Sequence, residues 1–166
     1  VCRAAASAQL KIKNAAPDSR DALAWKWQHG DTTLLGDFGD PLGATDYTLC
    51  IYDRSAGTPT LILRAAIPHG GTCHGKACWK PTGTSGFKYG DRDLTPDGIK
   101  SLQLKAGAAG AASLTLKAKG DRLQPALPLT QDPSVTVQLR NTLGGCWGST
   151  FTAPATRNDG AQFSDR

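Results

Sequence analysis

The chain has 166 residues, a mass of 17.4 kDa and a net charge of +5, which is the size of one domain with a substantial hydrophobic core. Hydrophobic residues make up 39% and charged residues 20% of the chain, so its composition is globular and excludes intrinsic disorder. No apolar run approaches the roughly 18 residues that cross a bilayer, which excludes a membrane-spanning segment in these residues.

Apolar and polar residues alternate along most of the chain, and this period of two predicts β-strands. In chain order, the expected strands are marked by Leu10 and Ile12; Leu23, Trp25 and Trp27; the runs 47–52 and 60–66; Leu102 and Leu104; Leu114 and Leu116; Val135, Val137 and Leu139; and Trp147 with Phe151. Turn-forming residues at 53–57 and 107–110 predict hairpins. The alanine-rich segments 4–8 and 106–112 are too short for stable isolated helices, so no substantial helix is expected.

Eight or nine short strands separated by turns predict an all-β fold, an antiparallel two-sheet β-sandwich with Greek-key or jelly-roll-like connections. Residues 124–133 include three prolines, and we expect them to form an extended crossover because proline cannot donate to a central ladder. We expect residues 1–8 to form an N-terminal arm and residues 9–166 to form the single domain. Residues 9–13 are then a candidate strand for addition to a neighbouring molecule.

The chain contains no methionine and five cysteines. We therefore expect Val1 to follow a cleaved signal segment. The mature protein is expected to be secreted or held at the cell surface, where disulfides persist.

The cysteine spacing favours a disulfide-stabilised domain. Cys73 and Cys78 flank a four-residue loop, which favours a local bridge. Cys50 and Cys146 lie in two predicted strands, each on the face opposite the bulky apolar side chains, which favours a long-range bridge between them. Cys2 is then left over, as a free thiol, as a partner for another chain, or as a residue that displaces one of these pairings. Sequence alone does not select among the possible pairings.

A zinc site is the alternative use of the same region. His69, Cys73, His74 and Cys78 offer four nitrogen or sulfur ligands within ten residues. The adjacency of Cys73 and His74 departs from the usual two-residue spacing of a zinc knuckle, so the disulfide is favoured. We expect no cofactor.

Two groups of aspartates are expected to form turns. Asp91, Asp93 and Asp97 loosely resemble a calcium loop, but the third early ligand and the distal glutamate are missing. Around Pro41 and Gly43 lies the second group, which comprises Asp37, Asp40 and Asp46.

No motif of nucleophilic catalysis is present. Residues 83–86 read Gly-Thr-Ser-Gly, which is not the Gly-x-Ser-x-Gly pattern, and His29, His69 and His74 lie in loops without a recognisable partner pattern. We therefore expect a protein that is not an enzyme, with a small secreted hydrolase as the alternative.

The tryptophans and lysines bear on possible partners. Trp25, Trp27, Trp79 and Trp147 could stack on sugars if exposed, but Trp25 and Trp27 share a strand face with Leu23, so core packing is the default. Six lysines fall mainly on the polar faces of predicted strands, where they keep a sheet soluble: Lys11, Lys13, Lys100, Lys105, Lys117 and Lys119. No basic run is interleaved with aromatic residues, so nucleic acid is not an expected partner.

The stretch 71–80, followed by 86–89 and 94–98, resembles a domain of unknown function that occurs in secreted and cell-surface proteins of environmental bacteria, often at the C-terminal end of a longer chain. The segments 25–27, 37–41, 49–53, 135–139 and 146–147 also resemble its pattern, and the resemblance covers roughly residues 9–165. It implies export, a small β domain and no established active site. It also implies that Cys50, Cys73, Cys78 and Cys146 are the structural set, with Cys2 as the extra cysteine.

Together these features predict a non-catalytic secreted or cell-surface module with a structural or interaction role. Self-assembly into an extracellular filament or surface layer is the specific expectation, with self-association or a cell-surface partner implied. A carbohydrate- or surface-binding β-sandwich is the alternative, with a glycan as its partner.

Overall fold

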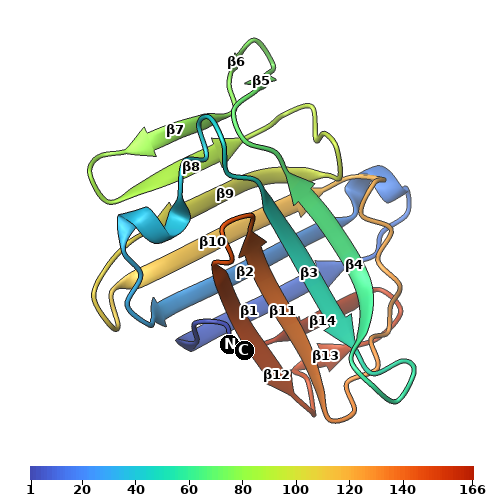
Figure 1. Cartoon of the computed structure of the whole chain (residues 1–166). Helices are drawn as coiled ribbons and strands as arrows, with labels where there is room; N and C mark the ends of the chain where they lie inside the picture. The colour runs from blue at the N-terminus through green and yellow to red at the C-terminus, as the bar shows by residue number, and fades with distance from the viewer.

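The computed structural model describes all residues 1–166, which form a sandwich of antiparallel sheets. The strands of the four-stranded sheet cross those of the eight-stranded sheet steeply (Figure 1). Two short 3₁₀ turns, Asp18–Arg20 (η1) and Leu35–Phe38 (η2), are the only helical elements, and neither could span a membrane. The predicted all-β, disulfide-stabilised sandwich is therefore confirmed.

Hairpins supply most neighbours within each sheet. The eight-stranded sheet consists, in spatial order, of β13 (Arg157–Asn158), β14 (Gln162–Asp165), β1 (Ala5–Lys13), β2 (Ala22–Gly30), β10 (Ala112–Lys119), β9 (Ile99–Lys105), β8 (Gly86–Gly90) and β7 (Trp79–Thr82). The four-stranded sheet consists of β12 (Cys146–Thr152), β11 (Ser134–Asn141), β3 (Tyr47–Asp53) and β4 (Thr60–Ile67). A separate two-stranded hairpin pairs β5 (Thr72–Cys73) with β6 (Lys76–Ala77). Residues 124–133 contain no strand and carry the chain from β10 to β11 in the other sheet, as predicted.

The core fills the space between the two sheets. Trp25 and Trp27 of β2 are fully buried, and their indole N–H groups donate to Ser149 Oγ at 2.8 Å and to the Gly148 carbonyl at 3.1 Å. Both acceptors belong to β12, so these bonds connect the centre of one sheet to the edge of the other. The apolar half of the period-two pattern therefore faces the opposite sheet, and the polar half faces outward.

The first residues of the chain join the two sheets. Arg3 forms a parallel bridge with Trp147, in which the Arg3 N–H donates to the Cys146 carbonyl at 2.8 Å and the Gly148 N–H donates to the Arg3 carbonyl at 2.9 Å. The chain then enters β1, which lies between β2 and β14 in the larger sheet. The boundary expected at residue 8 thus falls inside a strand. Residues 9–13, expected to be available to a neighbour, are an interior strand with Ile12 only 1% exposed.

The disulfides differ in part from the expected pairing. Cys73 pairs with Cys78 as predicted, but Cys146 pairs with Cys2, and Cys50 is a buried free thiol. The predicted Cys50–Cys146 bridge is wrong because β11 lies between β3 and β12. Two interstrand spacings separate those strands by about 10 Å, beyond the roughly 7 Å that a disulfide spans between Cα atoms. Cys2, and not Cys50, therefore belongs to the structural set.

We predict unequal stabilisation by the two bridges. The Cys2–Cys146 bridge joins residues 144 apart, whereas Cys73 and Cys78 are five apart. In the chain-entropy model, the Cys2→Ser/Cys146→Ser variant should lose about 5 kcal/mol of unfolding free energy and the Cys73→Ser/Cys78→Ser variant about 2 kcal/mol. Guanidinium unfolding of both variants measures the difference. Cys50→Ser is the control that leaves both bridges intact, and a larger loss from the local bridge would contradict this ranking.

Candidate functional site

The residues considered for zinc are occupied in other ways. Cys73 and Cys78 are bridged, so neither sulfur is a thiolate ligand. His69 Nδ1 lies 2.7 Å from Asp46 Oδ1, and the backbone N–H of His69 donates to the same oxygen at 2.8 Å. That backbone bond, opposed by partial desolvation, lowers the pKa of the Asp46 carboxyl. His74 Nδ1 lies 3.3 Å from Asp93 Oδ1, so each histidine closes a loop against its own aspartate.

The aspartates considered for calcium bond to different parts of the chain. Asp91 is buried, and its carboxylate accepts the backbone N–H groups of Asp93 and Thr95, each at 2.8 Å. Asp97 instead accepts the N–H of Ala66 in β4 at 2.8 Å. These three carboxylates therefore do not converge on one point, and no group of three or more potential metal ligands is assembled in the chain.

Two of the other three predicted turn aspartates bond to their own loops, whereas the third, Asp46, bonds to His69. Asp37 accepts the N–H of Leu34, and Asp40 accepts the N–H groups of Leu42 and Gly43. The predicted turn role is confirmed for Asp37 and Asp40.

No nucleophile lies beside an imidazole. His29 Nδ1 lies 3.2 Å from the Gly110 carbonyl, while His69 and His74 pair with aspartates. No hydroxyl or thiol is within hydrogen-bond distance of these three rings.

All four tryptophans are in the core, as predicted, with at most 2% of each exposed. Trp79 lies between two tyrosines, with ring centroids 5.5 Å from Tyr47 and 5.2 Å from Tyr89, and its indole N–H donates to the Pro68 carbonyl at 2.8 Å. The tryptophans therefore do not form the stacking surface on which the sugar-binding alternative rested.

Alkaline pH should destabilise this aromatic cluster. Burial, with a contribution from the Asp91 charge, raises the pKa of Tyr89 to about 12, against about 10 in an unfolded chain. Between these values the unfolded state releases a proton that the folded state keeps, so stability falls as pH rises through this window. Tyr89→Phe should make that fall less steep and change stability little at pH 7, because the hydroxyl makes only a 3.4 Å bond to the Thr95 carbonyl. Denaturant unfolding at pH 7 and about pH 11 tests this; equal pH slopes in the variant and the parent would contradict it.

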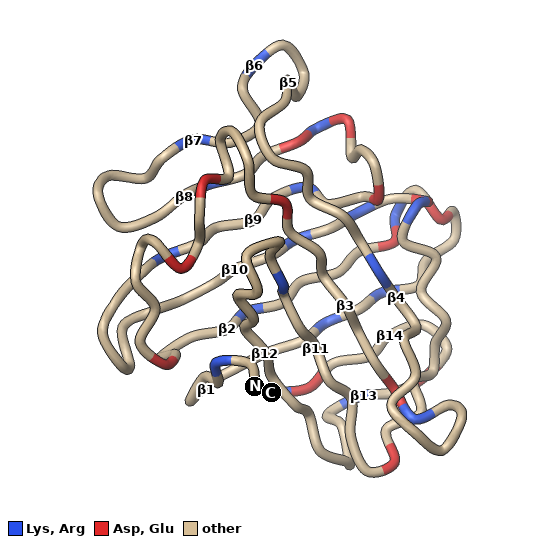
Figure 2. The backbone as a smooth tube through the Cα atoms, in the orientation of Figure 1, with Lys and Arg blue, Asp and Glu red and all other residues tan.

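The outer face of the eight-stranded sheet gathers most of the lysines. Nine of the ten lysines lie at exposed positions on its strands: Lys11, Lys13, Lys26, Lys80, Lys88, Lys100, Lys105, Lys117 and Lys119. We call this surface the lysine face. Figure 2 shows basic residues along these strands and acidic residues mainly in the surrounding turns. Asp165 is the only acidic residue in the sheet, and it pairs with Leu10, which points inward.

The lysines of this face are not neutralised within the molecule. All four salt bridges use arginine or histidine as the cation. Apart from the nine lysines, the chain has ten basic and fourteen acidic residues, a net charge of −4. The lysine face therefore carries a charge of +9 on a molecule that is otherwise acidic. The separation of charge between this face and the rest of the surface is much greater than the net charge suggests.

The strand register gives this face a defined hollow. Lys11, Ala24 and Lys117 form one cross-strand row, and Lys13, Ala22 and Lys119 form the row beside it. The two alanines of β2 are the floor, the lysines of β1 and β10 are the walls, and Lys100 of β9 also lines the hollow. This hollow, which we call the lysine trough, has a volume of about 230 Å³ and contains no acidic residue. Lys26 follows next on β2 and ends the alanine floor.

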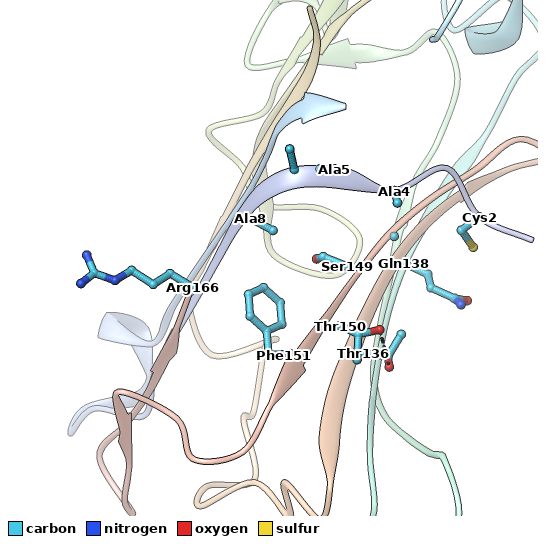
Figure 3. Close-up of a pocket in the computed structure, with 12 residues that line it drawn as sticks. Cys2, Ala4, Ala5, Ala8, Thr136, Gln138, Ser149, Thr150, Phe151 and Arg166 are labelled. Carbon is cyan, nitrogen blue, oxygen red and sulfur yellow. Dashed lines mark hydrogen bonds between the residues drawn. The ribbon is translucent and has the colours of Figure 1, made fainter. Parts of the chain in front are cut away.

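A second concavity lies along the edge of β12. Figure 3 shows this groove, which has a volume of about 460 Å³, between the start of β1 and residues of β12. Ala5 and Ala8 line one side, Thr150 and Phe151 the other, and Arg166 lies at its end. β14 pairs with β1 only from Leu10 onward, so the first half of β1 has a strand neighbour on one side only. The second half of β12 likewise pairs only with β11.

Sequence analysis placed six of the nine lysines on the polar faces of strands. It did not predict that these strands belong to one sheet. The other three lysines each follow or precede a buried aromatic residue, and this alternation could have placed them on strand faces as well. They are Lys26 beside Trp25, Lys80 beside Trp79, and Lys88 beside Tyr89. That signal assigns each lysine to a strand face, and only the strand order places β1, β2 and β10 side by side.

Comparison with family models, with curated proteins and with solved structures finds no match to this chain. The resemblance to a domain of secreted and cell-surface proteins stays a prediction.

Proposed function

We propose that this protein is a non-catalytic extracellular interaction module that attaches to an anionic polymer or surface through the lysine face. One observation carries the proposal: nine lysines without a salt-bridge partner share one sheet face, and Asp165 on β14 is the only acidic residue in that sheet. The two disulfides support an oxidising compartment, where cell-envelope polyanions are available as partners. The hydrolase alternative has no supporting arrangement of side chains.

The shape of the face suits an extended partner. Strand side chains stand nearly perpendicular to a sheet, so the ammonium groups form a broad array and not a closed pocket. Such an array attracts a polymer with many weak contacts, because each exposed ion pair contributes little by itself. Binding should therefore depend strongly on ionic strength, since the Debye length falls from about 10 Å at 0.1 M salt to about 3 Å at 1 M.

Binding to polygalacturonate tests the proposal. The protein should bind immobilised polygalacturonate at low salt and dissociate from it at about 1 M NaCl. It should not bind the methyl-esterified polymer, which has the same backbone without the charge. The triple variant Lys26→Gln/Lys88→Gln/Lys117→Gln should bind about tenfold more weakly or worse, since each lysine near an anionic surface contributes up to about 1 kcal/mol.

A matched variant controls for net charge. Arg54→Gln/Arg64→Gln/Arg140→Gln removes the same charge from the strands and loops of the four-stranded sheet. It should keep affinity within about threefold of the parent, which is less than 1 kcal/mol. Equal losses in the two triple variants, or no binding by the parent protein at low salt, would refute attachment through the lysine face.

Self-assembly is a second candidate function. The β12 groove supports it through strand edges beside the groove, and not through donation of residues 9–13 as expected from the sequence. The two half-paired edges beside the groove, residues 5–9 and 149–152, contain no charged residue and no proline. Exposed edges usually carry such residues to prevent strand addition. An extended segment of a second copy could therefore pair there through main-chain hydrogen bonds.

Light scattering after gel filtration, with electron microscopy at rising concentration, tests this assembly. Thr150→Lys places a charge on the β12 edge and should shift the protein toward monomer. Thr48→Lys is the matched control, because it adds the same charge on the interior strand β3 at a position outside the groove. A parent protein that is monomeric at every concentration, or identical assembly of both variants, would rule out this interface.

A further inference from the structure

We infer that the lysine trough is the primary site on the lysine face and that it takes a linear carboxylated polysaccharide lying along β2. This inference rests on the proposed attachment to anionic polymers and adds the location, the direction and the ligand class.

The register places ammonium groups on both sides of the same line. Lys11 and Lys117 flank Ala24, and Lys13 and Lys119 flank Ala22, so two opposed pairs follow one another along β2. The two rows are two residues apart, a spacing of about 7 Å along the strand. A polymer that crossed the strands would meet one row only, whereas a polymer parallel to β2 meets both.

The floor determines how closely a ligand can approach. Ala22 and Ala24 are half-buried, and a methyl side chain is the only group above the backbone of β2 at these positions. Beyond them Lys26 rises from the same strand. A ligand in the trough therefore reaches the level of the lysine stems and gains contact with their methylene groups as well as with their charges.

The width of the trough admits one chain. β1 and β10 are the two neighbours of β2, so the walls stand two strand spacings apart, about 10 Å between backbones. Their lysine side chains narrow this opening further. One extended polymer chain fits between the walls, with its charged groups directed alternately to the lysines of β1 and of β10.

The chemistry of the face favours a polysaccharide over nucleic acid. No aromatic residue occupies an outward position on β1, β2, β9 or β10, so bases would find no ring on which to stack. The trough contains no arginine, the residue suited to bidentate contact with phosphate. Lysine acts as a point charge that pairs with separate carboxylates, which a uronate polymer supplies along its length.

Four variants locate the site with polygalacturonate as the probe. Lys11→Gln/Lys117→Gln removes one opposed pair from the trough, and Lys88→Gln/Lys105→Gln removes the same charge from the lysine face outside it. Ala24→Ile fills the floor without changing charge, and Thr115→Ile makes a similar addition at an outward position on β10 that is outside the trough. All four change outward side chains on strands, and thermal unfolding verifies that each variant is folded.

We expect the trough pair and Ala24→Ile each to weaken binding about tenfold, and the two controls to stay within about threefold of the parent. Equal losses from both lysine pairs, with Ala24→Ile binding like the parent, would overturn the trough and leave attachment through the whole face intact. Absence of polygalacturonate binding by the parent protein would instead refute the proposed function itself. Tighter binding of an oligothymidylate than of polygalacturonate at equal charge would overturn the ligand class.

Discussion

The inward packing of β2 is the constraint on which the outer surface depends. Trp25 and Trp27 are fixed in the core by complete burial and by hydrogen bonds to β12. Since side chains alternate strictly along a strand, Ala24 and Lys26 must then face outward. The neighbouring strands are fixed in the same way by buried Leu10, Ile12, Leu114 and Leu116. A slip of one residue in any of them would move lysines into the core, so the packing also fixes the position of the charges.

The energies explain why so many like charges are tolerated together. Two ammonium groups about 10 Å apart in water repel by about 0.4 kcal/mol before salt screening. Burial of one large apolar side chain contributes about 1.5–3 kcal/mol, several times more. Packing therefore dominates, and the sheet forms although its outer face is charged. A bound polyanion would relieve the remaining repulsion, and this relief would favour the proposed attachment.

Local pattern and long-range pairing were not equally predictable. The alternation of apolar and polar residues identified the main strands and their buried faces, including Trp25 and Trp27. This pattern could be read from the sequence because it involves only residues two positions apart. The neighbours of each strand depend on distant parts of the chain: β2 pairs with β10, more than eighty residues later. The Cys50–Cys146 error has this origin. Both residues were correctly placed on outward strand faces, but only the strand order shows that β11 separates them and that residues 2–3 lie along β12.

The same distinction separates attraction from selectivity on the lysine face. Lysines occur across the whole sheet, and each contributes a field that any polyanion would feel. The alanines are different, because Ala22 and Ala24 stand between two pairs of lysines only where β1, β2 and β10 are aligned in their observed register. A larger side chain there would leave the net charge unchanged but keep a ligand at the level of the lysine tips, where screening by water and salt is greatest. In the proposed site, close approach of a polyanion, and with it discrimination among polyanions of different thickness, would therefore depend on the two alanines.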